Sequence, residues 1–269
     1  MKLLVKLLDK VIYKLNYSKL NISKTVLFNF RTMPFKTAVK LPVFLYGKVD
    51  IYLLKGEIEF SGCKVNRGMI RMGMNKDYLG TVKGASLIVL APHSKITFTG
   101  NSEFSSNFLI RTGENAKLKI GKGTFFGSSI KIVCIKKISI GNFTQIAFES
   151  QVIDSDFHFT YDLKKQELKP REKEIIIGNY NWIGNRSVIY KGTKTNNYTI
   201  IASSSLVNKN YLKSENKYLV LAGQPAKIVA EDIRRIYPLK LEEKLFQLSS
   251  NNFGGLPNEL SNEIIESFN

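Results

Sequence analysis

Two aspartates and a histidine are clustered in one polar stretch of the chain. Asp154, Asp156 and His158 lie within residues 153–174, which read IDSDFHFTYDLKKQELKPREKE. Imidazole titrates near neutral pH and can accept a proton from a hydroxyl as a general base. A carboxylate that accepts a hydrogen bond from the other ring nitrogen fixes the tautomer of such a base, as in Ser-His-Asp sites. The stretch alone is equally compatible with a solvated surface histidine, so the chemistry depends on the elements that hold it.

These elements show a six-residue repeat. Downstream of the polar stretch, aliphatic or β-branched residues recur at every sixth position: Ile177, Ile183, Ile189, Thr195, Ile201 and Val207. A period of six fits neither an α-helix nor a simple strand, and short fixed repeats of this length are typical of a parallel β-helix. Each coil would contain three short strands, with glycine or asparagine at corners that need a positive φ. An ordinary β-sandwich with chance spacing is the alternative.

The repeat also extends upstream of the polar stretch. The six-residue register includes Ile120, Phe126, Ile132 and Ile138, slips by two residues, and resumes with Ile140, Ile146 and Val152. We interpret the slip as a corner bulge or a small loop. From residue 46 onwards, short β segments alternate with glycines, which predicts early, irregular coils of the same solenoid. Residues 153–174 are then the one clear break in the repeat, and a loop of this length inside a repeat is typically functional or disordered.

The two ends of the chain are predicted to contain helices. Residues 1–20 place seven aliphatic residues on one helical face and lysines elsewhere, which is typical of an amphipathic helix. Such a helix packs on the domain or on a neighbouring subunit, or it docks on a membrane surface through its lysines. Residues 228–248 predict one or two helices that cap the solenoid. The predicted organisation is an N-terminal helix with an irregular segment (1–45), a β-helix domain (46–210) and a C-terminal extension with helices (211–269).

The composition of the chain indicates which partners and which cellular compartment to expect. The 269 residues carry a net charge of +18, which indicates attraction to anionic partners, although the lysine and asparagine usage of an AT-rich genome explains it about as well. No zinc-finger spacing, RNA-binding aromatic motif or homeodomain-like helix is present, so a nucleic-acid partner is not expected. Cys63 and Cys134 form neither a CxxC motif nor a disulfide framework, which favours a reducing, cytoplasmic location. No apolar run is long enough to span a bilayer.

Two blocks of sequence resemble a known family. Residues 177–184 (IGNYNWIG) and residues 222–227 (AGQPAK) resemble the left-handed β-helix, hexapeptide-repeat acyltransferases, especially those that O-acetylate sugars and capsular polysaccharides. In that family a catalytic histidine lies in a D-x-D-x-H-like loop before the first block, as residues 154–158 do here. The resemblance is specific between about residues 138 and 229. Three positions depart from the family pattern and predict one irregular coil: Thr195, Asn196 and Ala202.

The resemblance implies an acetyl-CoA-dependent O-acetyltransferase that transfers acetyl directly to a sugar hydroxyl in a ternary complex. His158 would be the general base, with Asp156 or Asp154 as its partner, and Trp182 would lie against the thioester end of coenzyme A. Family positions near the pantetheine arm or the adenosine phosphates correspond here to Asn185, Ser203, Asn208, Lys209 and Lys227. Ser129 falls where related enzymes carry a substrate-contacting residue. Trimers with sites between neighbouring solenoids are usual in the family, so a homotrimer is expected.

Two functions other than O-acetyl transfer are alternatives for the same fold, and a third is excluded. An N-acetyltransferase for an amino-sugar nucleotide would be favoured by an N-terminal nucleotide-binding domain, and residues 1–45 are too short and irregular for one. A solenoid that binds polysaccharide without catalysis is a further alternative. A three-histidine zinc site is excluded because the chain has only His93 and His158, so no metal is expected.

Overall fold

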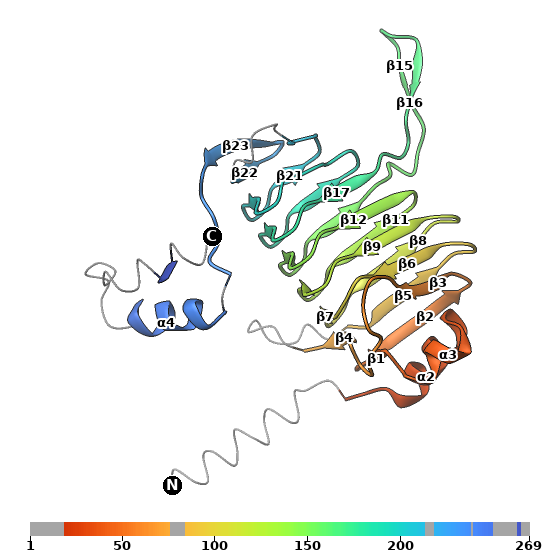
Figure 1. Ribbon diagram of the computed structural model, residues 1–269. Coiled ribbons are helices and arrows are strands. Elements are labelled where there is room, and N and C mark those ends of the chain that lie inside the picture. The colour runs from red at the N-terminus through yellow and green to blue at the C-terminus, as the bar shows by residue number, and fades with distance from the viewer. Residues whose placement is uncertain (1–18, 76–83, 213–217, 238, 250–262, 265–269) are drawn as a thin grey trace.

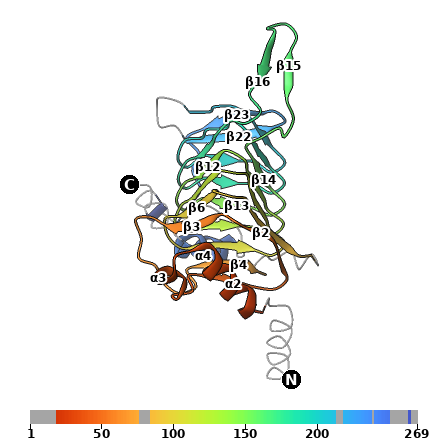
Figure 2. The same ribbon diagram turned by 90° about the vertical axis from the view of Figure 1, so that its right-hand side faces the viewer.

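The computed structural model describes residues 19–75, 84–212, 218–237, 239–249 and 263–264, and most of them form a three-sided solenoid (Figures 1 and 2). Each coil contributes a strand to each of three sheets, and successive coils pair in parallel. Sheet I contains β1 (Val43–Leu45), β4 (Ile70–Met74), β7 (Ser102–Ser105), β10 (Thr124–Phe126), β13 (Gln145–Ile146), β18 (Trp182–Ile183), β20 (Ile200–Ile201), β22 (Leu219–Gly223) and β23 (Ala226–Glu231). Sheet II contains β2 (Val49–Leu54), β5 (Ser86–Leu90), β8 (Leu109–Thr112), β11 (Lys131–Cys134), β14 (Gln151–Ile153), β19 (Val188–Tyr190) and β21 (Leu206–Val207). Sheet III contains β3 (Glu57–Phe60), β6 (Lys95–Phe98), β9 (Lys117–Ile120), β12 (Lys137–Ile140) and β17 (Ile175–Ile177).

Stacked ladders of inward-facing side chains form the core. One ladder, on sheet I, consists of Phe126, Ile146, Ile183 and Ile201, which pair in register from coil to coil and are buried. A second ladder, on sheet II, consists of Ile132, Val152, Ile189 and Val207, and it is buried as completely. Each aliphatic side chain removed from water in this way contributes roughly 1.5–3 kcal/mol to the gross hydrophobic stabilisation. The predicted hexapeptide-repeat parallel β-helix is therefore confirmed.

The two-residue slip in the repeat lies at the corner between β11 and β12. Before the hairpin, paired residues of successive coils are 20 positions apart, as in Ile120 and Ile140, whereas after it they are 18 positions apart, as in Ile189 and Val207. The longer coil thus has two extra residues, and they lie at this corner, as the sequence predicted. The ladder of β12 itself contains no bulge, because its residues pair in register with those of β9 and β17.

Two helices at the start of the described chain replace the predicted irregular segment. They are α2 (Ile22–Thr32) and α3 (Phe35–Ala38). Asn29 exchanges two hydrogen bonds with the backbone of Val43, at 2.7 and 3.1 Å, and the Thr25 hydroxyl accepts one from the Leu45 amide at 3.0 Å. Side chains of α2 thus satisfy the edge of β1 that faces away from β4. Of the helix predicted over residues 1–20, all but the last two residues lie outside the described part of the chain.

The solenoid extends further towards the C-terminus than predicted. Val220 and Leu221 of β22 pair in parallel with β20, so residues 219–223 form another rung of sheet I. β23 then turns back antiparallel to β22 and ends the sheet. The helical prediction for residues 228–248 was wrong at its start, because residues up to 231 belong to β23, and the helix there is α4 (Leu239–Ser249). None of the helices in the described ranges is long and apolar enough to cross a membrane.

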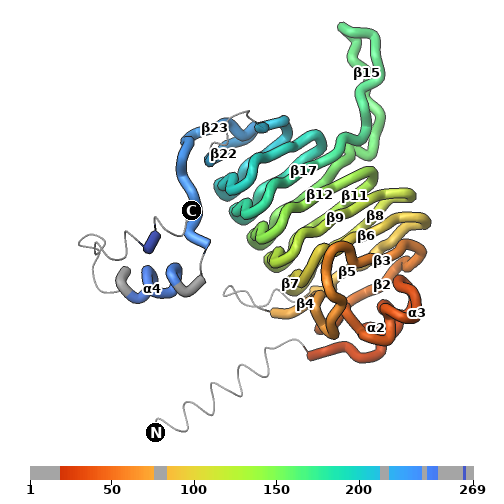
Figure 3. The backbone as a smooth tube through the Cα atoms, in the orientation of Figure 1, coloured from red at the N-terminus to blue at the C-terminus, as the bar shows by residue number. Residues whose placement is uncertain are grey.

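The break in the repeat is a β-hairpin. After β14 the chain leaves the solenoid and forms β15 (Thr160–Asp162) and β16 (Glu167–Lys169), which pair antiparallel and project away from the coils (Figures 1 and 3). The chain then re-enters sheet III at β17. The hairpin therefore emerges at the corner between sheets II and III, from the coil that carries β12, β13 and β14.

Candidate active site

Asp154 fixes the first limb of the hairpin to the preceding corner. Its carboxylate is fully buried and accepts hydrogen bonds from the amides of Ile135, Lys136 and Lys137 at 2.7, 2.9 and 2.7 Å. These amides form the corner between β11 and β12, at the start of the same coil. Asp154 is therefore occupied within the wall of the solenoid, and the structure places it against backbone and not against His158.

Asp156 fixes the hairpin to the following coil. Its carboxylate accepts a hydrogen bond from the Tyr190 hydroxyl at 2.5 Å and another from the Lys191 ammonium. Partial burial raises the pKa of Asp156, but the bonds from Lys191 and Tyr190 outweigh that effect and hold the pKa below its ordinary value. The same contact raises the pKa of Tyr190 to about 12. The base of the hairpin is thus held on one side by Asp154 and on the other by Asp156.

His158 lies just beyond this anchored base. Its side chain is exposed, and it follows Phe157, whose φ is +62° and whose amide donates to the Ser155 hydroxyl at 3.0 Å. Among the residues that the structure describes, no hydrogen bond joins His158 to Asp154 or Asp156. The imidazole is therefore placed by the backbone of a pinned turn, and it is open to a ligand or a neighbouring molecule.

Trp182 lies on another side of the solenoid. It points outward from β18 on sheet I, its side chain is 41% exposed, and the Arg235 guanidinium lies 5.2 Å from its ring centroid. Arg235 also bonds to Gln145 and, at 3.2 Å, to Glu242, so the chain after β23 partly covers the indole. Sheet I does not border the corner from which the hairpin leaves. A single chain therefore keeps Trp182 and His158 apart.

The remaining predicted ligand-binding residues fall into three places. Asn185 and Ser203 lie together at the corner between sheets I and II, where the Ser203 hydroxyl donates to the Asn185 side chain at 2.6 Å. Ser129 occupies the same corner two coils below Asn185, with φ +59°. Asn208 and Lys209 follow β21, and Lys227 lies on β23. The structure thus brings Asn185 and Ser203 into direct contact.

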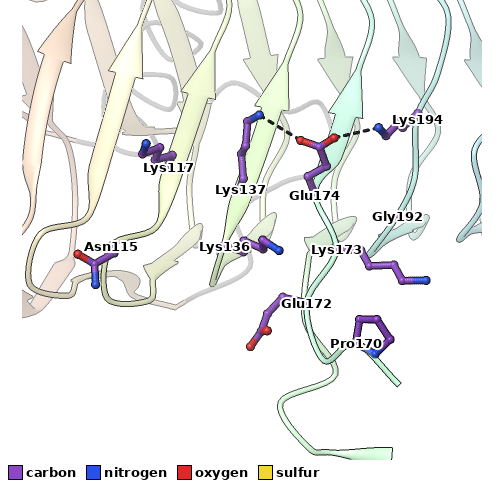
Figure 4. Close-up of a pocket in the computed structure, with 10 residues that line it drawn as sticks. All are labelled: Asn115, Lys117, Lys136, Lys137, Pro170, Glu172, Lys173, Glu174, Gly192 and Lys194. Atoms are coloured by element: carbon purple, nitrogen blue, oxygen red, sulfur yellow. Dashed lines mark hydrogen bonds and ion pairs between the residues drawn. The ribbon is translucent and has the colours of Figure 1, made fainter. Parts of the chain in front are cut away.

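A lysine-rich cavity lies at the base of the hairpin, on sheet III (Figure 4). Its volume is about 750 Å³, and its lining residues are Asn115, Lys117, Lys136, Lys137, Pro170, Glu172, Lys173, Glu174, Gly192 and Lys194. Glu174 bridges Lys194 at 2.9 Å and Lys137 at 3.1 Å, and these bonds hold its pKa below the ordinary value. Five lysines against two glutamates leave the cavity positively charged. Such a site suits a ligand that carries phosphate or carboxylate groups.

Sequence reasoning missed this cavity because its lysines come from different coils. The only signal was their register: Lys117 and Lys137 occupy equivalent positions on the successive strands β9 and β12 of sheet III. The described residues contain no group of three or more histidine, cysteine, aspartate or glutamate side chains that could hold a metal ion. Burial raises the pKa of the Cys134 thiol, which keeps this thiol protonated and unsuited to nucleophilic attack.

Comparison with known proteins gives distant relatives. No protein-family model matches the chain. A polysialic acid O-acetyltransferase of Escherichia coli O1:K1 is 29% identical over 134 residues, which cover 49% of this chain and 42% of that protein. An uncharacterized 24.8 kDa protein in the cps region of Klebsiella pneumoniae is 24% identical over 204 residues, which cover 76% of this chain and 86% of that protein.

The match to the Escherichia coli enzyme thus spans less than half of that enzyme's length. Among solved structures, the polySia-specific acetyltransferase NeuO matches with a TM-score of 0.45 and 19% identity over 78% of this chain and 98% of that one. The chain thus forms a parallel β-helix with hexapeptide rungs, and part of it is similar in sequence to a polysialic acid O-acetyltransferase.

Proposed function

We propose that the protein transfers an acetyl group from acetyl-CoA to a hydroxyl of a sugar or surface polysaccharide. The observation that carries the proposal is the double anchoring of the hairpin by Asp154 and Asp156, which holds His158 at a fixed, exposed point of an otherwise regular solenoid. The relationship to a polysialic acid O-acetyltransferase supports the same reaction type. The lysine-rich cavity at the base of the hairpin favours an acidic acceptor.

The reaction needs one base and no covalent enzyme intermediate. His158 accepts the proton of the acceptor hydroxyl while its oxygen attacks the thioester carbonyl. The carbon–sulfur bond then breaks, and the departing thiolate of coenzyme A takes the proton from the imidazolium. Such general-base assistance contributes about 10²- to 10⁴-fold. Asp154 and Asp156 have positioning roles in this scheme, because their carboxylates hold the hairpin through other residues.

The residues expected to hold the donor fit coenzyme A in chemical type. Trp182 offers an exposed indole N–H, and the Ser203–Asn185 pair offers exposed polar groups for the amides of the pantetheine arm. Lys209 and Lys227 are exposed cations suited to phosphates. Coenzyme A would supply the activated acetyl group as its thioester.

The separation of His158 from Trp182 argues for an active site shared between chains. A homotrimer would place the hairpin of one solenoid against sheet I of its neighbour, so that one chain supplies the base and the next holds the thioester. A cytoplasmic location, where acetyl-CoA is available, belongs to the same proposal, as does membrane contact through residues 1–20.

The direct test is release of coenzyme A thiol from acetyl-CoA in the presence of polysialic acid, other acidic glycans, neutral glycans and amino-sugar nucleotides. A His158→Asn variant should lose about 10²- to 10⁴-fold in rate. A His93→Asn variant is the matched control, because His93 is the other histidine, is exposed and has φ +58°, which asparagine tolerates. Acetylation of the amino group only, or equal rates for both variants, would refute the proposal.

Mixed oligomers test the shared site. His158→Asn and Trp182→Ala should each be inactive alone, whereas co-expression should restore part of the activity, because some interfaces then combine an intact His158 with an intact Trp182. Activity that stays absent in purified mixed oligomers would show that both residues act within one chain.

A further inference from the structure

Helix α2 is amphipathic, but its mainly polar face is the one that packs on the solenoid. Its buried residues are Thr25, Phe28, Asn29 and Thr32. Asn29 and Thr25 bond to the edge of the solenoid, and the Thr32 hydroxyl donates to the Phe28 carbonyl of the helix itself. A surface helix normally turns its apolar stripe towards the core and its polar face to water. Here the polar side is used inward, so the apolar side chains of α2 other than Phe28 are left outside.

These outward side chains join those of α3 in one apolar surface. Its members, which we call the N-terminal patch, are Ile22, Val26, Leu27, Phe30, Phe35 and Val39, with exposed fractions of 70, 40, 54, 45, 74 and 50%. The rings of Phe30 and Phe35 meet edge to face with centroids 5.9 Å apart, which connects the two helices. Contiguous exposed apolar surface of this kind marks a site of contact with a protein or a membrane.

The charges around the patch favour a membrane over a second copy of the chain as its partner. Residues 19–49 contain no aspartate or glutamate, and their cations are Lys19, Lys24, Arg31, Lys36, Lys40 and Lys48. Arg31, Lys36 and Lys40 are exposed and alternate with the apolar residues of the patch. Two copies of such a face would repel each other. An anionic lipid surface instead attracts the cations while it accepts the apolar side chains, as it does with basic amphipathic helices.

We propose that the N-terminal patch docks the protein on an anionic lipid bilayer. Figure 1 shows α2 and α3 at the end of the solenoid opposite the hairpin, so docking leaves the hairpin free. Along sheet II, β14 lies four strand spacings beyond β2, which corresponds to roughly 20 Å at about 4.8 Å for each spacing. This inference uses residues outside the proposed active site and does not depend on the proposed reaction.

The test is co-sedimentation of the full chain with phosphatidylcholine vesicles, prepared with and without phosphatidylglycerol. The patch variant carries Ile22→Ser, Phe30→Ser and Phe35→Ser, and the control variant carries Leu163→Ser, Leu168→Ser and Val229→Ser, which are 84, 63 and 60% exposed elsewhere. Wild type and control should bind the anionic vesicles, with binding that weakens as salt rises. The patch variant should bind at least about tenfold more weakly, because it loses three inserted apolar side chains.

The same variants test whether the N-terminal patch contacts a second copy of the chain or residues 1–18 instead of a membrane. Thermal melts and acetyl transfer to a lipid-free acceptor should match wild type in the patch variant, since all three substituted side chains are largely exposed. Failure of wild type to bind anionic vesicles, or equal binding by the patch variant, would overturn the proposal. So would a change of oligomeric state in the patch variant, which would identify a second copy as the partner. A full-length variant with Leu4→Ser and Leu8→Ser should bind no better than wild type, because stronger binding would show that residues 1–18 normally cover the patch.

Discussion

The wall of the solenoid and the hairpin that leaves it are built on different principles. In the wall, side chains such as Ile183, Ile189 and Ile201 are at most 1% exposed and stack in register with the coils on either side. In the hairpin, both strands are solvated, and Leu163 and Leu168 are 84 and 63% exposed. An isolated two-stranded hairpin is only marginally stable in water. Its position must therefore come from the base, where two carboxylates tie it to the coils.

The close stacking of the wall also limits its sequence. A Cβ added at Gly178 would lie 2.4 Å from the backbone oxygen of Asn196 in the next coil. At the base of the hairpin, by contrast, the bonds that hold the chain come from the carboxylates of Asp154 and Asp156. The wall is thus specified by backbone proximity and burial, whereas the hairpin is specified by a few polar bonds that single substitutions can remove.

The largest effect is expected at Asp154, where the hairpin and the wall meet. An Asp154→Ala variant leaves three backbone amides without an acceptor, and each hydrogen bond to a charged group is worth roughly 1.5–3 kcal/mol. Allowing for partial replacement by water, the free energy of unfolding should fall by about 4 kcal/mol. Urea unfolding followed by far-ultraviolet circular dichroism measures this change.

Asp162 provides the matched control for Asp154. It also accepts backbone hydrogen bonds, from Lys164 at 3.1 Å and Lys165 at 3.2 Å, but it does so near the tip of the hairpin. Asp162→Ala should leave the urea midpoint of the solenoid nearly unchanged. Equal losses in the two variants would mean that wall and hairpin unfold as one unit, and the contrast between them would fail.

A smaller effect is expected at Asp156, which belongs to the hairpin side of the junction. Asp156→Asn should reduce kcat by about 10- to 100-fold through displacement of His158, with little loss of global stability. The folded-state pKa of Asp156 lies below its unfolded value of about 3.9, so the carboxylate stabilises the folded state above that pH and loses this contribution as pH falls through the folded pKa. Wild type should therefore lose more stability than Asp156→Asn on acidification below about pH 4.

Tyr190 reports on the same contact independently. Its pKa of about 12 depends first on its bond to Asp156. In Asp156→Asn, ultraviolet titration should show this tyrosine ionising closer to the ordinary value of about 10. If the substitution changes neither the tyrosine titration nor kcat, Asp156 does not anchor the hairpin or position His158.

The wall was predictable from sequence and its ends were not. The ladder depends on local periodicity, which the aliphatic repeat records directly, and the interruption at residues 153–174 was visible for the same reason. Helix α2 was missed because its buried face is polar and therefore gives no apolar stripe. Residues 228–231 of β23 were predicted as helix because their strand state depends on pairing with β22, which tertiary structure supplies.

The candidate site was predictable only in its residue types. His158 and the two aspartates were recognisable as a cluster, and their roles remain proposals. The partners of Asp154 precede it in sequence by almost a full coil, and those of Asp156 lie on the next coil. No spacing motif encodes such contacts, because they arise from the register of stacked coils. The lysine-rich cavity escaped notice for the same reason.

The smallest effect is expected at Glu174, a wall residue that lines the cavity. Its ion pairs with Lys137 and Lys194 are partly exposed, so Glu174→Gln should change the free energy of unfolding by less than about 1 kcal/mol. The substitution also frees both ammonium groups, so KM for an acidic glycan should fall severalfold at low salt, while KM for a neutral acceptor stays constant. Lys137→Gln should shift KM for the acidic glycan in the opposite direction. If neither substitution changes that KM, the wall beside the hairpin has no part in acceptor binding, and recognition must lie with the hairpin or the neighbouring chain.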